Sequence, residues 1–411
     1  PEHPGPRPRR GNMLNAGIVI VTAAVVIGLF HPRMIDRTWW RATITPLASI
    51  IGSGFLVLGP ILDSEFGWAA PLVMAALCLG TYALGATIRY NIAALDAEAA
   101  RPRREEALDR LSEWALAFAY VISVAYYLNL LGAFGVSMTP VDDRLHARLV
   151  TSAVLVLILF VGWTRGFSAL ERMEQVSVSI KLAIIAGLLV GLGAYVWTTA
   201  KGGDLVLNPL RTTGWSAVAL GFGLIVTVQG FEISRYMGDS YDAPTRIRTM
   251  KYAQWISSAI YIIYITFFAY VFERGQLELT ETAIIDMMNI VAPILPVLLV
   301  AAALSAQFSA AVADTGGCGG LVAENTGGRV SQRAAYPGLV AIALGLTWFA
   351  EVFEIIAYAS RAFAVYYALQ AALCAATALR RGDRAMAAGA AAMAALALAV
   401  TLFGRPVEAG G

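Results

Sequence analysis

Long apolar stretches recur along almost the whole chain and are separated by short polar connections. A helix needs roughly 20 apolar residues, with a range of about 17 to 25, to cross a bilayer. Twelve segments fit this requirement, approximately residues 14–30, 38–62, 68–95, 112–138, 147–163, 173–198, 213–238, 252–272, 293–323, 334–350, 353–380 and 385–403. Nothing is left for a soluble domain, and the pattern predicts an all-α polytopic membrane protein.

Composition agrees with this prediction, because 58% of the residues are hydrophobic and only 14% are charged. Such a chain is not an ordinary soluble domain. Cys78, Cys318 and Cys374 lie far apart, in or beside apolar segments, which favours packing over a disulfide framework or a metal cluster. The three histidines are equally scattered, so we expect no metal site and no cofactor.

The sequence also argues against an enzyme and against a nucleic-acid partner. It contains no phosphate-binding glycine loop, no HExxH and no spacing that supports a catalytic triad. The net charge is +2, and no Lys/Arg-rich run resembles a nucleic-acid surface. The expected partners are a small-molecule substrate and the lipid bilayer, and the oligomeric state is left open.

The charges between the segments predict how the chain is oriented, because cytoplasmic connections carry an excess of Lys and Arg. Basic residues occupy every second connection, namely Arg33, Arg37 and Arg41, Arg101 to Arg110, Arg165 and Arg172, Arg246 to Lys251, Arg329 and Arg333, and Arg380 to Arg384. Acidic residues occupy the intervening connections, at 62–67, 273–286 and 351–354. The segment at 14–30 is predicted to be an accessory helix. If it spans, it leaves the basic N-terminus outside, and the alternatives are a helix that lies in the interface and a re-entrant one.

Two segments of the core are interrupted by glycine. Counted from Thr38, the first core helix contains "IIGSGFLVLGP" (50–60) and the sixth contains "GFGLIVTVQGFEISRYMG" (221–238). Five helices separate their starts, so the two run in opposite directions, as expected of two inverted five-helix repeats. The predicted organisation is a tail and accessory helix at 1–37, repeats at 38–200 and 201–381, and an additional C-terminal helix at 382–411.

These segments resemble the amino acid/polyamine/organocation (APC) superfamily of transporters. The resemblance rests on "IIGSGF" in the first core helix, on "GFE" (230–232) followed by "GDSYDAPTRIRTM", and on "VSVSIKLAIIAGLLVGLGAY" (176–195) in the fifth. It covers roughly Thr38 to Arg381 and implies a leucine-transporter-type fold, with ten core helices in two inverted repeats. The glycine-rich stretch at 313–328 and Arg361 in the tenth helix depart from the family pattern.

The two interruptions are the predicted substrate site, because a broken helix frees backbone groups and points helix dipoles at a ligand near the midplane. N–H groups near Ser53 and Gly54 are expected to hold a carboxylate, and carbonyls near Gln229 and Gly230 to receive an amine. The candidate residues are Ile51, Gly52, Ser53 and Gly54, Gln229, Gly230, Phe231 and Glu232, and Tyr120 and Tyr127 of an aromatic stripe with a seven-residue spacing. The alternatives are glycines that only allow close packing, a stripe that only packs, and a structural ion pair between Glu232 and Arg235.

The candidate coupling residues are Lys181, Ser305, Ser309 and Glu232. Lys181 lies about eight residues into the fifth core helix, roughly 12 Å deep. The family resemblance implies that its ammonium replaces the cation that sodium-coupled members hold between the first and eighth helices. Ser305 and Ser309 are at i and i+4 and could line the same cavity. A lysine that titrates there gives proton coupling, and one that stays charged gives an exchanger or a uniporter.

Together these observations predict a multi-pass secondary active transporter of the plasma membrane that works by alternating access. An amino acid or a related amine is the expected solute, carried by proton coupling or exchange rather than with sodium. The alternatives are a non-transporting sensor or receptor with the same fold, and a transporter of metal or other inorganic ions on the same scaffold.

Overall fold

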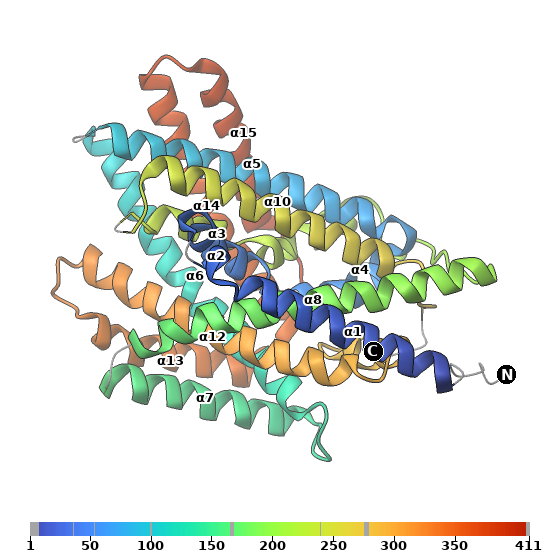
Figure 1. Ribbon diagram of the computed structural model, residues 1–411. Helices are drawn as coiled ribbons and strands as arrows, with labels where there is room; N and C mark the ends of the chain where they lie inside the picture. Colours follow the sequence, from blue (N-terminus) through green and yellow to red (C-terminus); the bar gives the residue numbers. More distant parts are fainter. Residues whose placement is uncertain are drawn as a thin grey trace.

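The apolar segments of the chain fold into a bundle of long helices, and no strand occurs among the residues described (Figure 1). The structure is a computed structural model and describes residues 8–35, 37–52, 54–98, 101–164, 168–238, 240–274 and 279–407. Among the described residues, seven helical segments are long and apolar enough to cross a membrane, and one of them joins α4 and α5 (Gly54–Ala97). Each of the twelve predicted segments coincides with a helix or with a helix that is broken, so the prediction of an all-α polytopic membrane protein is confirmed.

The elements of the first half come in the order that the hydrophobic pattern predicts. They are α1 (Pro8–Leu29), α2 (Pro32–Ile35), α3 (Thr38–Ile50), α4 (Gly54–Phe66), the 3-10 turn η1 (Gly67–Ala69), α5 (Ala70–Ala97), α6 (Arg103–Val136), α7 (Arg144–Thr164) and α8 (Ser168–Gly202). The first core helix is therefore the pair α3 and α4.

The second half repeats the pattern of one broken helix followed by four long helices. It consists of α9 (Gly214–Gly223), the 3-10 helices η2 (Ile225–Val228) and η3 (Phe231–Tyr236), α10 (Ala243–Phe268), α11 (Ala283–Val291), α12 (Leu295–Asn325), α13 (Gln332–Phe349), α14 (Val352–Arg380) and α15 (Arg384–Phe403). The sixth core helix is α9, η2 and η3, and α11 is a short helix between the seventh and eighth. The division into two inverted repeats at 38–200 and 201–381 stays a prediction.

Helix α6 forms the centre of the bundle, packed between α12 and α14. In the most apolar 18 residues of α6, 89% of the residues are buried, whereas only 22% are buried in the corresponding stretches of α7 and α15. This difference places α7 and α15 at the periphery, where their apolar side chains are left for lipid.

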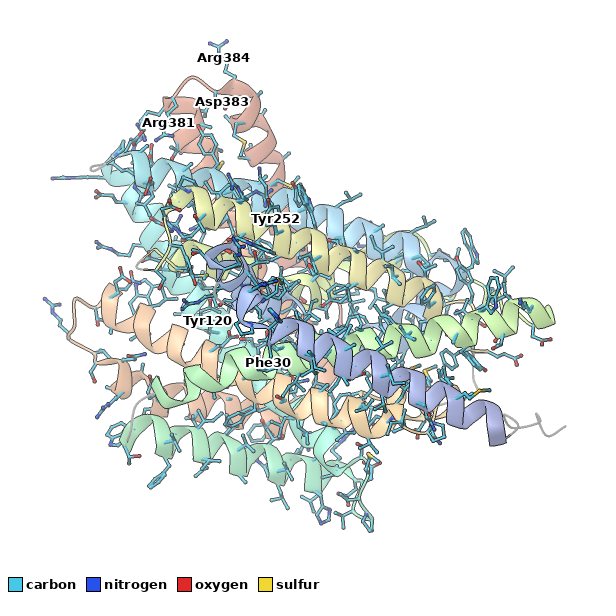
Figure 2. The ribbon with its side chains drawn as sticks, in the orientation of Figure 1. Phe30, Tyr120, Tyr252, Arg381, Asp383 and Arg384 are labelled. Atoms are coloured by element: carbon cyan, nitrogen blue, oxygen red, sulfur yellow. The ribbon has the colours of Figure 1, made fainter. Side chains whose placement is uncertain are left out.

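The basic connections gather at one end of the bundle. The turns between α5 and α6 and between α12 and α13 lie at the same end (Figure 1), and Arg380 at the end of α14 pairs with Glu98 and Glu105, which flank the first of these turns. Arg381, Asp383 and Arg384 lie there, well away from the interior Tyr120 (Figure 2). We call this end the inner end, following the charge pattern, and the opposite one the outer end.

The accessory helix α1 runs alongside α8 in the opposite direction (Figure 1). Ile18 packs against Gly191, and Thr22 lies so close to Gly187 that a Cβ there would clash. Two glycines four residues apart allow this close approach, as they do between membrane helices. Packing along the length of α8 favours the spanning interpretation of α1 over the interfacial one.

Candidate functional site

The first core helix is interrupted where the glycines predict it. α3 ends at Ile50, Ile51 and Gly52 are not helical, and α4 begins at Gly54. Ser53 lies outside the described residues. A Cβ on Gly54 would lie 2.8 Å from the Tyr126 hydroxyl and 2.9 Å from Cβ of Thr227, so this residue is also a point of close contact with the second broken helix.

The second interruption needs a glycine for two reasons. Gly230 has φ of +116°, a conformation that L side chains rarely adopt. In addition, a Cβ there would lie 2.6 Å from the carbonyl carbon of Ser49 and 2.8 Å from the amide nitrogen of Ile50. The second break, residues 229–230, therefore meets the last residues of α3 backbone to backbone, directly before the first break.

One hydroxyl links the carbonyl groups that the two breaks release. Tyr261 of α10 is fully buried, and its hydroxyl lies 2.6 Å from the carbonyl oxygen of Thr227 and 2.9 Å from that of Ile50. A phenol has a single hydrogen to donate, so it shares that hydrogen between two acceptors. The two carbonyl oxygens therefore lie close together, and each keeps a lone pair with which it can accept a further hydrogen bond.

Glu232 lies directly after the second break, in η3, and is 1% exposed. Its carboxylate accepts hydrogen bonds from the backbone N–H of Gly230 at 3.0 Å and from the Tyr367 hydroxyl at 2.8 Å. Tyr367 also lies 3.2 Å from the side-chain oxygen of Gln229, and its ring stacks on Phe231 at 5.3 Å. All four predicted residues of this break are thus held by one tyrosine of α14 or by each other.

The ion pair between Glu232 and Arg235 that the spacing allowed is not formed. Arg235 instead pairs with Asp109 of α6, and both side chains are buried. Asp109 also accepts from Arg101 at 2.6 Å and from the Gln370 amide at 3.4 Å. Glu232 accepts from the backbone N–H of Gly230, within its own segment, and Arg235 pairs with a carboxylate of another helix.

Lys181 reaches the first break from α8. Its ammonium donates to the carbonyl oxygen of Ala48 at 2.9 Å, in the last turn of α3, where a cation is favoured by the helix dipole. A cavity of about 10 Å³, room for about one water, adjoins it. The cavity is lined by Gly52, Phe55, Leu56, Lys181, Ile184, Ile185, Leu299, Ala302, Ala303 and Ala306.

The two serines of α12 do not line this cavity. Ser305 and Ser309 are half-buried, and α12 contributes Leu299, Ala302, Ala303 and Ala306 instead. The reason is rotational: residues 302 and 306 share the face that points at α8 and the break, and 305 and 309 lie on the flank of that face.

A comparison with known proteins decides the family. A family model described as an APC superfamily transporter matches residues 32–404. The chain belongs to the APC superfamily of transporters. It is also 38% identical, over 405 residues, to an uncharacterized protein of Aquifex aeolicus (strain VF5), with 95% of this chain and 97% of that protein covered. Helix α1 precedes the matched residues, in keeping with an accessory element.

The aromatic stripe of this APC transporter borders both breaks. Tyr127 lies beside Gly52, at 3.7 Å from where a Cβ would be. Tyr120 packs on Gly317 and edge-to-face on Phe363, and the Phe363 ring lies 6.5 Å from that of Tyr367, which binds Glu232. The stripe is thus part of the wall around the site.

Sequence reasoning did not assign site roles to Tyr126, Tyr261, Tyr367 or Gln307. The three tyrosines stand out in the sequence as polar rings within apolar helices, but the sequence does not indicate which of the two breaks each of them faces. Gln307 of α12 is fully buried, and neither its amide nitrogen nor its oxygen has a hydrogen-bond partner in the described part of the chain. An amide left in this way costs about 1–3 kcal/mol per unsatisfied group.

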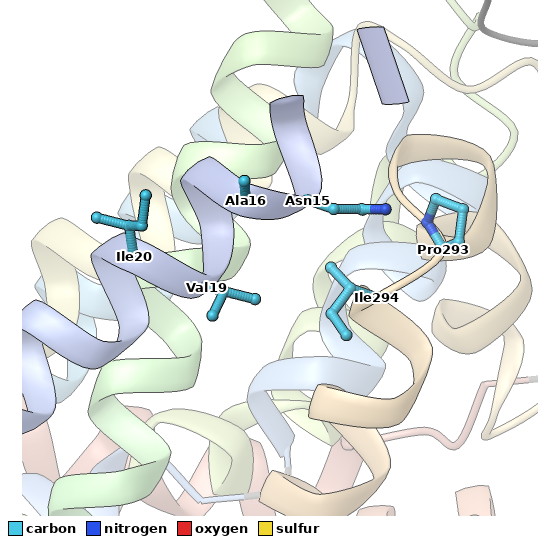
Figure 3. A pocket seen from close by; sticks show the side chains of 6 residues that line it. All are labelled: Asn15, Ala16, Val19, Ile20, Pro293 and Ile294. Carbon is cyan, nitrogen blue, oxygen red and sulfur yellow. The ribbon is translucent and has the colours of Figure 1, made fainter. Parts of the chain in front are cut away.

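A larger hollow of this transporter lies apart from the candidate site. It has a volume of about 490 Å³ and lies between α1 and the start of α12 (Figure 3). Its lining is Asn15, Ala16, Val19, Ile20, Pro293 and Ile294. It shares no lining residue with either break and offers one polar side chain, whereas solute sites need several convergent polar groups.

Proposed function

We propose that this protein is a secondary active transporter of a small organic solute, an amino acid or a related amine, and that it works by alternating access. The observation that carries the proposal is the close approach of the second break to the end of α3, with Gly230 against Ser49 and the Tyr261 hydroxyl shared by two released carbonyls. Freed N–H groups after the first break would hold the carboxylate of the solute, and the carbonyls would hold its amine. We place the protein in the plasma membrane, where such uptake is useful.

We further propose that the transporter is proton-coupled or an exchanger rather than sodium-coupled. The support is the Lys181 ammonium on the Ala48 carbonyl beside the cavity. A sodium ion about 4 Å away would be repelled by about 4 kcal/mol at an intermediate effective dielectric. The lysine and a sodium ion therefore exclude each other.

Uptake into proteoliposomes tests both proposals. Wild-type uptake of amino acids or amines should be equal in sodium and choline buffers, and it should respond to a proton gradient if Lys181 titrates. Lys181→Ala should lose that response or stall the transport cycle. Lys201→Ala, at the exposed outer end of the same helix, is the matched control and should behave as wild type. Strict sodium dependence of the wild type would refute the coupling proposal.

The same vesicles separate the alternatives. A sensor or receptor would bind a solute without moving it, and an inorganic ion transporter would move the ion but no amino acid.

A further inference from the structure

Gln307 differs from the other long buried amides of the core. Gln254 donates to the Thr81 carbonyl and accepts from Arg89, and Gln370 donates to Ser112 and accepts from Asn91. Gln307 is as buried as these two, yet neither end of its amide has a partner in the described part of the chain. Buried polar groups are nearly always hydrogen-bonded, so the exception needs an explanation.

The turn of α12 that carries Gln307 lies at the first break. Ala303, one turn earlier, and Ala306, the preceding residue, both line the cavity beside Gly52 and Lys181. One residue further along a helix turns the side chain by about 100°, away from Lys181 and toward the neighbouring helix on that side.

That neighbour is α6, which runs antiparallel to α12. Three contacts set the register: Tyr120 with Gly317, Ser123 with Asp314, and Gly135 with Leu304. In each pair the residue numbers sum to between 437 and 439, so Gln307 lies level with residues 130–132.

Tyr127 is one turn from that level on α6, and its ring contacts Gly52. The Gln307 amide therefore lies in the corner between the aromatic stripe and the first break, beside the region where the proposed site would hold the solute.

We propose that Gln307 is a specificity-determining residue that hydrogen-bonds the side chain of the transported solute. This inference rests on the proposed function and narrows it. A carboxamide offers a donor and an acceptor in one plane, and its complement is a group that offers both in return. The solute class is therefore a neutral amino acid with a polar side chain, of the carboxamide kind for the best match.

The amide of Gln307, which has no hydrogen-bond partner in the described part of the chain, would make the site selective between polar and apolar solutes. A site built to hydrogen-bond a solute rejects an analogue that lacks the group, because the polar groups of the site are then left unpaired. The wild type should therefore prefer glutamine or asparagine to leucine by at least tenfold in uptake.

The test replaces Gln307 by Leu and, as a second variant that keeps the length of the side chain, by Met. Both variants should lose the preference for glutamine over leucine by tenfold or more while still transporting leucine. Without solute, both should melt at a higher temperature than the wild type, because two unsatisfied groups are gone. Gln254→Leu is the matched control: it should lower the melting temperature, since it leaves Arg89 without its partner.

The outcomes separate the two levels of the proposal. If the wild type transports amino acids and both Gln307 variants keep its preference, this inference is wrong and the proposed function stands. If the wild type prefers leucine, the inference is wrong as well. If the wild type moves no amino acid or amine, the proposed function fails and the inference falls with it.

Discussion

Replacing Asp109 with asparagine removes the counter-charge of the buried Arg235 without changing the size of the side chain. Arg235 belongs to η3, directly after the second break, and Asp109 belongs to the central helix α6. The pair therefore ties the inner part of the broken helix to the scaffold. If the protein works by alternating access, as we propose, we expect η3 to move away from α6 when the inner side opens, so that this pair holds the inner side closed.

The magnitude follows from burial. The Arg235 side chain is 3% exposed and that of Asp109 is 9% exposed. Removing one partner of a buried ion pair costs about 3–5 kcal/mol, because the remaining charge is left without compensation. An inner opening that exposes Arg235 to water would relieve this cost. The equilibrium constant between the closed and the inward-open state can then change by up to roughly 150-fold to 5000-fold in favour of the inward-open state.

Thiol labelling can measure the shift. Ser234, the neighbour of Arg235 on η3, is fully buried, so a Ser234→Cys reporter should react slowly in the closed state. Adding Asp109→Asn should raise its labelling rate from the inner side at least tenfold. Glu98→Gln is the matched control: Glu98 also binds two arginines, Arg380 and Arg381, but at the exposed inner surface, where water screens the pair.

Two results would contradict this reasoning. One is an unchanged labelling rate in Asp109→Asn together with an unchanged melting temperature. The other is an equal effect of Glu98→Gln, because burial would then not be the cause.

Two further predictions concern single positions. Gly230→Ala should abolish transport and destabilise the fold, by about 1–3 kcal/mol for the strained backbone and about 1–3 kcal/mol for the contact with Ser49. An uptake assay measures the first effect and a thermal melt the second. Normal uptake would mean that the breaks are loosely packed. The hydrogen bonds from Arg380 and Arg381 lower the pKa of Glu98 from 4.5 to about 2, so its contribution to stability is complete above about pH 4.5 and is lost as the pH falls toward 2. The difference in melting temperature between wild type and Glu98→Gln should be constant from pH 5 to 8 and shrink below pH 4.5, and a difference that changes between pH 5 and 8 would refute the assignment.

Much of the fold could be predicted from the sequence because membrane segments carry a strong local signal. The apolar segments place the helices, and the glycines at 52, 54 and 230 place the breaks, since both follow from properties of consecutive residues. The depth of Lys181 is also a local property, which follows from its position within one apolar run.

The partners of polar residues could not be predicted, because they are decided between helices far apart in the chain. The i, i+3 spacing of Glu232 and Arg235 describes one helix only. Their actual partners, Tyr367 and Asp109, lie 135 and 126 residues away. The rotation of α12 about its axis is likewise fixed by its neighbours, which is why Ala302 and Ala306, rather than the serines, line the cavity.

A single face of α14 connects the site to the closure of the inner side. Tyr367 holds the Glu232 carboxylate, and Gln370, three residues later, donates to Ser112 and lies 3.4 Å from Asp109. Residues three apart on a helix are neighbours on one face, so both contacts belong to the same rigid surface. η3 carries Glu232 and Arg235 within six residues, and it cannot release Asp109 by moving without also shifting Glu232 against Tyr367. If the protein works by the alternating access that we propose, a solute that binds at the second break and displaces Tyr367 would loosen the Asp109 pair, and solute binding would thereby favour inner opening.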